Sequence, residues 1–399
     1  MRNRNPIFFL FIVYTFIIFA GGYWMGRTGW PLIQLGVATS TVPPEARETF
    51  APFWEVWNLV DDRYYDQPVD PVAMTEGAIR GMLDTLDDPN TRYLPPAAEE
   101  SARQSMEGEL EGIGVRVEYV DGNVTVVSPF EGSPADEAGL QPGDVLREAD
   151  GVNLTGIGLT EAAELIRGPA GTTVHLVVER NGETFEVDVE RDVISIPSVR
   201  SEMLEQDVGY VRVNRFSNPT PEELRTALED LMAENPEGLI LDLRNNPGGG
   251  LDTAVDVADQ FLAEGTILIE RFGDGEERVF EASGEGLAQD VPIAVLVNEG
   301  SASASEVVAG ALRDHDRATL IGTTTFGKGT VQTWHALSNG GGVRITFARW
   351  LTPDGTWVTE GGLEPDIMVQ RAEEGEEPAE GAEPQDAQLD AAINFLSDR

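Results

Sequence analysis

The sequence predicts an α/β core of βαβ units, with a mostly parallel sheet and added antiparallel strands, an inserted β-rich domain and an N-terminal transmembrane helix. From residue 208 onward, apolar strand-like runs alternate with helix-like runs, which is typical of a parallel sheet. Between residues 111 and 189, short strands of alternating polarity follow one another. Residues 7–25 form an almost unbroken apolar stretch, close to the ~20 residues that span a bilayer.

The composition limits the classes of function. The 399 residues are enough for two or three domains. The net charge of −43, from 27 basic and 70 acidic residues, excludes nucleic acid as an expected partner, because phosphates need a basic surface. The absence of cysteine from the sequence excludes disulfides, thiol catalysis and cysteine-bound metals.

The N-terminal segment is expected to be an uncleaved signal anchor over residues 1–27. Arg2 and Arg4 precede the apolar stretch, so the positive-inside tendency keeps this end in the cytoplasm and exports the rest. A cleaved signal peptide is the alternative. Residues 28–47, rich in proline and glycine, are predicted to be a linker.

Residues 48–107 are predicted to be helical. Apolar residues recur at helical spacing over residues 50–60, and residues 74–86 and 97–106 are two further helix candidates. The aromatic stretch at 50–60 is either core or a dimer surface, and the sequence leaves this open. A homo-oligomer or a regulatory partner is among the expected partners.

The β-rich domain is expected over residues 108–192. Strands are predicted at 113–117, 124–127, 143–149, 174–179 and 185–189, and short helices at 133–139 and 159–166. The last two strands form a hairpin over Asn181 and Gly182, a pair that favours a tight turn.

The α/β core is expected over residues 193–371. Its predicted strands are 209–213, 238–243, 293–297 and 318–321, and its helices are 221–234, 251–262 and 303–313. Strands at 330–336 and 343–351 are expected to add antiparallel edges. Residues 372–399 form an acidic tail, predicted to be disordered to residue 385, with a terminal helix candidate at 386–396.

A serine-rich turn follows the strand at 293–297 and opens the next helix. It contains Ser301, Ser303 and Ser305, and serine is itself a favoured helix cap. A hydroxyl there would also lie beside the free N–H groups and positive dipole of a helix start, which suit a developing oxyanion. Spacing alone does not choose among the three serines.

Lys328 follows 25 residues after Ser303, between two glycines. A lysine can activate a serine hydroxyl only where burial strips much of its proton affinity. Gln332 comes four residues later, on the same side of an extended strand, and is expected to hold the amine. A lone lysine is otherwise an ordinary surface residue.

The turn at residues 244–250, R-N-N-P-G-G-G, also joins a buried strand to a helix. Its glycines allow close backbone approach, so it is a candidate second oxyanion donor. A phosphate loop is the competing interpretation, but the G-x-x-x-x-G-K-[ST] spacing is absent. A serine–histidine triad through His315 lacks the G-x-S-x-G elbow, and no H-E-x-x-H motif supports a metal protease.

At these residues the chain resembles the carboxy-terminal processing peptidases, also called tail-specific proteases. The resemblance covers roughly residues 50–369. It is carried by four blocks in the family's order, namely L-D-L-R-N-N-P-G-G at 241–249, N-E-G-S-A-S-A-S-E at 298–306, G-T-T-T-F-G-K-G-T-V-Q at 322–332 and G-L-E-P-D at 362–366.

The resemblance implies a role for each matched residue. It places the nucleophile at Ser303, the base at Lys328 and the glutamine that orients the base at Gln332. It implies oxyanion donors at the Ala304 N–H and at Gly248, with Gly249 as the alternative. It implies neither a metal nor an organic cofactor.

The β-rich domain resembles a PDZ domain. This resemblance implies that the loop formed by Gly112, Ile113, Gly114 and Val115 captures the terminal carboxylate of a peptide, which adds a strand to the following segment. Arg167 is a candidate for coupling this domain to the active site. The expected partners are protein or peptide substrates with free, apolar C-termini.

The expected protein is a membrane-anchored serine endopeptidase of a bacterium, with its catalytic part in the periplasm or at the cell surface. A non-catalytic PDZ scaffold with an inactive protease fold is the alternative. The sequence leaves open whether the PDZ-like domain activates or inhibits, and whether the resting site is assembled.

Overall fold

The computed structural model describes residues 44–120, 122–359, 361–370 and 386–398. Its contacts divide the chain into a unit that ends at Met74 and a larger unit that begins at Thr75, and each is a separate body. The first unit contains helices α2 (Pro44–Thr49) and α3 (Ala51–Arg63), and helix α4 (Pro71–Asp84) begins in it. Helix α3 confirms the predicted helix at 50–60, and α2 occupies the end of the expected linker.

The expected membrane anchor at residues 7–25 lies outside the described residues. Within the described ranges, no helix has both the length and the apolar character needed to cross a bilayer.

The larger unit is built on a parallel sheet with one antiparallel edge strand. The strand order is β10–β11–β12–β15–β16–β19, with β10 antiparallel to β11 and every other pair parallel. These strands are β10 (Val199–Met203), β11 (Val208–Val213), β12 (Gly238–Asp242), β15 (Ile293–Val297), β16 (Ala318–Gly322) and β19 (Ile367–Met368). The short 3₁₀ helix η1 (Glu205–Asp207) joins the first two.

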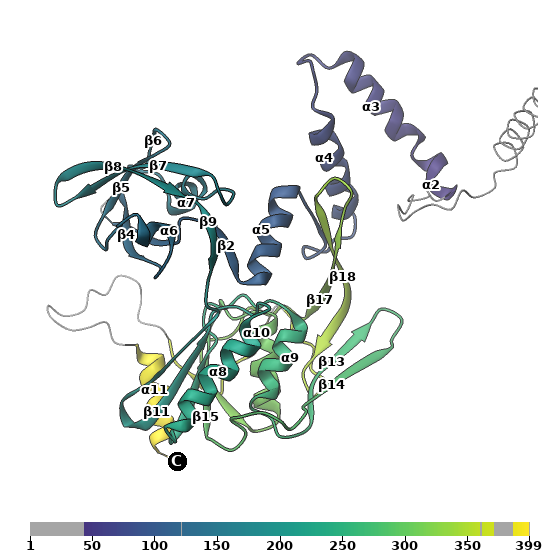
Figure 1. Cartoon of the computed structure of the whole chain (residues 1–399). Coiled ribbons are helices and arrows are strands. Elements are labelled where there is room, and N and C mark those ends of the chain that lie inside the picture. Colours follow the sequence, from purple (N-terminus) through teal and green to yellow (C-terminus); the bar gives the residue numbers. More distant parts are fainter. Residues whose placement is uncertain (1–43, 121, 360, 371–385, 399) are drawn as a thin grey trace, which may run out of the picture. The chain divides into compact units, whose positions relative to one another are not determined.

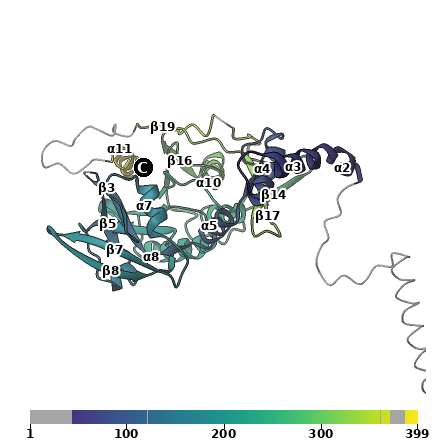
Figure 2. The ribbon, with the colours of Figure 1, turned by 90° about the horizontal axis from the view of Figure 1, so that it is seen from above.

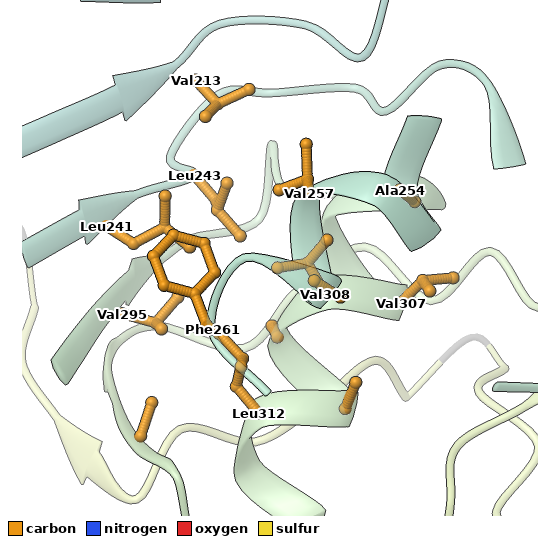
Figure 3. Packing of buried hydrophobic residues seen from close by; sticks show 14 of the residues in the cluster. Val213, Leu241, Leu243, Ala254, Val257, Phe261, Val295, Val307, Val308 and Leu312 are labelled. Atoms are coloured by element: carbon orange, nitrogen blue, oxygen red, sulfur yellow. The ribbon is translucent and has the colours of Figure 1, made fainter. Parts of the chain in front are cut away.

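Both faces of this sheet are buried, which explains why its central strands read as continuous apolar runs. Leu241 and Val295 face helices α8 (Thr220–Ala233), α9 (Leu251–Asp259) and α10 (Ala304–Asp314), in the core shown in Figure 3. Their neighbours Ile240 and Leu296 point to the opposite face and pack against the terminal helix α11 (Ala387–Ser397). In Figure 1, α8, α9 and α10 lie together, and α11, in yellow, lies away from them.

The terminal helix is therefore part of the core. Its existence confirms the prediction at 386–396, but Ala392 and Leu396 are buried on the sheet, so this end of the chain is not a loose tail. The acidic segment that precedes it, residues 372–385, lies outside the described residues.

A second sheet is wholly antiparallel and corrects one prediction. The strands at 330–336 and 343–351 were expected to edge the parallel sheet, but they form their own sheet with three strands from elsewhere in the chain. It contains β1 (Arg92–Leu94), β13 (Thr266–Phe272), β14 (Glu277–Glu281), β17 (Thr330–Ala336) and β18 (Gly342–Leu351). Strand β18 alternates between buried and exposed residues over much of its length, a pattern that suits a sheet covered on one face.

The β-rich domain has its own core, centred on Val124, Leu146 and Leu176. Its strands run in the order β3–β4–β5–β7–β8, with β6 paired to β5, and Figure 2 shows them grouped with helix α7. They are β3 (Val115–Val120), β4 (Asn123–Pro129), β5 (Val145–Ala149), β6 (Val152–Asn153), β7 (Thr173–Arg180) and β8 (Glu183–Glu190). Its helices are α6 (Pro134–Glu137) and α7 (Leu159–Ile166).

The two ends of this domain meet in a short antiparallel pair. Strand β2 (Glu109–Gly112) enters the domain and β9 (Asp192–Ser195) leaves it. Helix α5 (Pro96–Glu107) leads into β2 and ends at Gly108, whose φ of 75° suits glycine at a helix end.

Candidate active site

The three serines of the predicted nucleophile turn differ in their surroundings. Ser301 and Ser305 are fully buried, and their hydroxyls donate to the carbonyls of Leu243 and Asn246 at 2.8 and 2.9 Å. These bonds fasten the turn after β15 to the turn after β12. Both hydroxyls are therefore structural.

Ser303 is only half-buried and lines a cavity of about 830 Å³. Its backbone has φ 55° and ψ −112°, a conformation that costs energy for any residue with a side chain. Strain of this kind gathers at functional sites. The geometry thus separates Ser303 from its two neighbours, a choice that spacing alone did not allow.

Lys328 lines the same cavity, from the loop before β17. Burial lowers the pKa of its ammonium, repulsion from Arg344 and Arg92 lowers it further, and Asp88 and Glu306 oppose the shift. The flanking glycine is a steric requirement, because a Cβ at residue 329 would lie 1.8 Å from the Val358 carbonyl oxygen. The Gly-Lys-Gly sequence thus lets the loop pack tightly while the amine stays in the cavity.

Gln332 lies in β17 and lines the cavity as well. Its amide donates to the hydroxyl of Thr330 at 2.8 Å and to that of Thr346 at 3.4 Å. Between described residues, no hydrogen bond joins the Lys328 ammonium to Ser303 or to Gln332. The predicted contact between Lys328 and Gln332 is thus not made in this form, although both groups face one cavity.

The glycine turn after β12 lies against the serine turn. A Cβ at Gly248 would come within 2.9 Å of both the Ala304 nitrogen and the Ser303 Cβ, and its φ is 93°, so only glycine fits there. The Gly248 N–H donates to the Asn246 side chain at 2.9 Å. The N–H groups of Ala304 and Gly249 have no acceptor among the described residues, which leaves them available to a ligand in the cavity.

Glu306 is a functional candidate that the sequence interpretation missed. This fully buried carboxylate accepts bonds from the Ser303, Gly327 and Lys328 N–H groups and from the Thr325 hydroxyl, at 2.6–2.9 Å. It therefore ties the serine turn directly to the lysine loop. The signal was present, because Ser303 and Glu306 have the Ser-x-x-Glu spacing of a capping box.

Arg244, at the start of the glycine turn, is the second missed residue. Its guanidinium donates a hydrogen bond to the Asp242 carboxylate at 2.7 Å and another to the carboxylate of Asp386, which precedes α11, at 2.9 Å. Desolvation lowers the pKa of Arg244, but the bonds to both carboxylates more than offset this and raise it. Burial raises the pKa of Asp386, but the bonds from Arg244 and the Leu389 N–H lower it below its ordinary value.

The lysine content carries a further signal. The chain has 26 arginines and a single lysine, and that lysine is Lys328. Arginine does not lose its proton in proteins and cannot act as a base, whereas a buried lysine can. The single lysine of the chain thus lies in the same cavity as Ser303.

The loop at residues 112–115, predicted to bind a peptide carboxylate, is held in place by backbone and side-chain hydrogen bonds. Ile113 is buried, Gly114 has a φ of 70°, and their carbonyls accept bonds from the Ala135 N–H and the Ser133 hydroxyl. Strand β3 begins at Val115 and is the edge of its sheet, with α7 in contact, so an extended peptide could pair with it. Arg167 follows α7 and is exposed beside Gly112.

The alternatives with histidine or metal find no support in the described part of the chain. The His315 ring bonds the Thr266 carbonyl at 2.7 Å and does not line the cavity. No group of three or more metal-binding side chains occurs among the described residues.

Three family models match the chain in separate places. Peptidase family S41 matches residues 207–369, the PDZ domain matches residues 125–180, and the activating protease CtpB N-terminal domain matches residues 18–97. The peptidase match contains both turns and the lysine loop.

Full-length relatives extend this likeness. The chain is 37% identical to the carboxy-terminal processing protease CtpA of Bacillus subtilis over 79% of this chain and 68% of that protein. It is 40% identical to the carboxy-terminal-processing protease of Bartonella bacilliformis, over 80% and 75%. It is 39% identical to the carboxyl-terminal-processing protease of Synechocystis, over 86% and 81%.

Solved structures agree. The photosystem II D1 C-terminal processing protease aligns with a TM-score of 0.50 at 33% identity, over 82% of this chain and 94% of that one. A structure from Bacteroides fragilis aligns with a TM-score of 0.56 at 18% identity, over 92% and 99%, which shows the fold alone. With its S41 core, its PDZ domain and these relatives, the chain belongs to the carboxy-terminal processing proteases, which are serine proteases.

Proposed function

We propose that the chain cleaves peptide bonds with a serine–lysine mechanism in which Ser303 is the nucleophile and Lys328 the base. The observation that carries this proposal is the separation of the three serines. The hydroxyls of Ser301 and Ser305 donate buried hydrogen bonds, whereas Ser303 has a strained backbone and lines the same cavity as Lys328.

The reaction would proceed through an acyl-enzyme. The Ser303 oxygen attacks the scissile carbonyl carbon as its proton passes to neutral Lys328. The protonated amine then gives this proton to the leaving nitrogen, so the peptide C–N bond breaks and the amine product departs. Water attacks the ester, again with Lys328 as base, and restores the hydroxyl.

The oxyanion would be held by the Ala304 N–H and by one donor from the glycine turn. One such donor is typically worth about 3 kcal/mol of barrier. Gly248 lies closest to the serine turn, but its N–H is engaged by Asn246, so Gly249 supplies the unengaged donor of this pair. Gln332 would orient Lys328 once a substrate closes the site.

Substrate selection would fall to the PDZ domain. The loop from Gly112 to Val115 would bind the C-terminal carboxylate of a protein, and the peptide would extend β3 along α7. Arg167, whose side chain lies beside Gly112, would sense an occupied loop. An Arg167→Ala protein with unchanged turnover of C-terminally recognised substrates would remove Arg167 from this scheme.

The domain order that fits this function is an anchor at 1–27, a linker at 28–47, a helical segment at 48–107, a PDZ domain at 108–192, a peptidase core at 193–371 and an acidic tail. The apolar stretch at 7–25 behind Arg2 and Arg4 supports a single-pass anchor with the catalytic part outside the cytoplasm. The exposed aromatic side of α3 supports a role in pairing with a second copy or a regulator.

The direct test is cleavage of an unfolded protein with an apolar C-terminus by the full chain, beside Ser303→Ala and Lys328→Ala. We expect both substitutions to lower kcat/KM by about 10⁴-fold or more. The exposed Ser338→Ala is the control and should cleave like wild type.

Cleavage that survives in either catalytic variant would remove that residue from the mechanism. Binding of C-terminal peptides without any cleavage by wild type would favour the non-catalytic scaffold instead.

A further inference from the structure

The cavity beside Ser303 has a charge opposite to that of the chain. Four charged residues line it, and all four are cations: Arg92, Arg215, Lys328 and Arg344. Among the residues that the structure describes, no carboxylate lines this cavity, although the chain carries 70 acidic and only 27 basic residues. The wall formed by Arg92, Arg215 and Arg344, here called the arginine wall, is therefore a concentrated positive region in a strongly negative protein.

Two of these arginines are held face to face by the fold. Strand β1 pairs antiparallel with β18, and Arg92 lies directly opposite Arg344 in that register. Like charges directly opposite each other destabilise a sheet. The Arg344 guanidinium is also fixed over the Trp334 ring, 4.3 Å from its centroid, so it is not free to turn away.

The arginine wall has no internal counterion. Among the described residues, no carboxylate oxygen lies within 4.0 Å of the guanidinium of Arg92, Arg215 or Arg344. The charge of Glu99 opposes the lowering of the Arg344 pKa, and its carboxylate accepts a hydrogen bond from the Trp334 indole N–H at 2.5 Å. Burial and mutual repulsion lower the pKa of Arg344, as expected for cations without partners.

Arg215 completes the wall from a different element. It follows β11, and its carbonyl oxygen accepts a bond from the buried Thr220 hydroxyl at 3.0 Å, which anchors its backbone. Its half-buried side chain lines the cavity with the glycine turn and Ser303. Three cations from three separate segments thus converge on the space where a substrate would be cut.

We propose that the arginine wall is a subsite for a carboxylate of the peptide substrate, close to the scissile bond. Guanidinium groups match carboxylates with paired, charge-assisted hydrogen bonds. An incoming carboxylate would relieve the repulsion between Arg92 and Arg344 that the free protein bears. This inference rests on the proposed peptidase function and adds a substrate preference to it.

The carboxylate has two sources, an Asp or Glu side chain near the scissile bond or the C-terminal carboxylate of a short substrate or product. The experiment separates them with two sets of labelled peptides. The first set is C-terminally amidated and differs only by Glu or Gln, moved through each position within four residues of the cleaved bond. The second set contains Gln only and differs by a free or an amidated C-terminus.

Arg215→Gln is the best probe of the wall. Arg215 is not among the charges that shift the pKa of Lys328, whereas Arg344 and Arg92 are, so this substitution should leave the base unchanged. Arg349→Gln is the matched control, because Arg349 lies on β18 but outside the cavity, over the Trp357 ring. Each peptide pair and each variant pair together form a double-mutant cycle.

We expect wild type to prefer the carboxylate peptide of one set by about tenfold or more in kcat/KM. Arg215→Gln should remove most of that preference, because it should lower kcat/KM for the carboxylate peptide far more than for the neutral one, and Arg349→Gln should keep the preference. The set that shows the preference identifies the source of the carboxylate. Equal cleavage of both members of both sets by wild type, or a preference unchanged in Arg215→Gln, would overturn the proposal.

A binding measurement separates this proposal from the mechanism. Fluorescence anisotropy with the Ser303→Ala protein measures peptide affinity without cleavage. A Glu peptide that binds more tightly than its Gln partner through Arg215 would support the subsite even if serine–lysine catalysis failed. Equal affinities would reject the subsite even if cleavage by wild type were normal.

Discussion

The charged residues that support the serine and glycine turns differ from those that line the cavity, because the first set has hydrogen-bond partners and the second lacks a counterion. Next to the serine and glycine turns, Glu306, Asp242 and Arg244 are buried and Asp386 is partly exposed, and all four are hydrogen-bonded. By contrast, the arginine wall and Lys328 line a cavity on which no carboxylate lies among the described residues. Buried charges cost too much energy to be left unpaired for structural reasons. The paired set thus holds the turns in place, and the unpaired set is the one that we propose meets the substrate.

The largest loss of stability and activity is expected from Glu306→Gln. The amide keeps the shape but turns one acceptor into a donor, and at either oxygen position that donor faces at least one N–H group, which cannot accept. We expect the free energy of unfolding to fall by about 2–4 kcal/mol. The misplaced lysine loop should lower kcat/KM by about 10²-fold or more.

Chemical denaturation and peptide cleavage measure the two effects. Glu299→Gln is the matched control, because Glu299 is exposed and accepts one bond, from Thr323. An equal loss in both variants would mean that Glu306 is not the link between the two loops.

A smaller loss of unfolding free energy is expected from Asp386→Asn, which weakens the hydrogen bond between Arg244 and the residue before α11. Because the Asp386 side chain is 40% exposed, solvent screens the pair and the loss should be about 1 kcal/mol. The folded-state pKa of Asp386 is lowered, so its contribution is present above the unfolded pKa of about 3.9 and is lost as the pH falls below it.

Unfolding curves at pH 7 and pH 3 measure this contribution. The difference between wild type and Asp386→Asn should be full at pH 7 and smaller at pH 3, because the pH then approaches the lowered pKa of the Asp386 carboxyl. Asp398→Asn, at the exposed far end of the same helix, should match wild type throughout. A constant difference at both pH values would contradict the assignment to the Arg244 pair.

The pH dependence of cleavage tests the role of the cations that line the cavity. In the proposed mechanism neutral Lys328 is the active form, so kcat/KM should rise with pH and level off below the ordinary lysine pKa of about 10.4. Arg344 is one of the charges that lower the pKa of Lys328. Arg344→Gln should therefore move the rising limb to higher pH, and an unmoved limb would show that the wall does not tune the base.

The smallest effect is expected from salt. The net charge of −43 makes the folded chain repel itself, and added salt screens that repulsion, so the unfolding temperature should rise by a few degrees between low and high salt. Salt should at the same time weaken binding of carboxylate peptides at the arginine wall. A melting temperature that falls with salt would contradict the first expectation.

Much of the fold was predictable because its periodicity is local. The strands at 293–297 and 330–336 and the helix at 159–166 match the structure to the residue, since apolar runs and turn residues mark them. The pairing of strands was not predictable in the same way. Strands β1, β13 and β18 come from distant parts of the sequence, and nothing local shows that they share a sheet.

In the candidate site, too, local motifs were predictable and contacts between distant residues were not. The serine turn, the glycine turn and Lys328 are visible as motifs, but the choice of Ser303 depends on where three hydroxyls point. Glu306 carried a local signal in its capping-box spacing, whereas Asp386 meets Arg244 across 142 positions. Arg92 and Arg344 carried no signal at all, because only the register of β1 on β18 brings them together.

The central claim is that Lys328 is a base with a lowered pKa, and the sequence makes this directly measurable. Because Lys328 is the single lysine of the chain, protein labelled with ¹³C-lysine gives one side-chain signal by NMR. We predict that this signal titrates with a pKa clearly below about 10.4, and that Arg344→Gln raises it. A titration at or above that value in wild type would mean that the amine is protonated when the enzyme works, and would contradict the account.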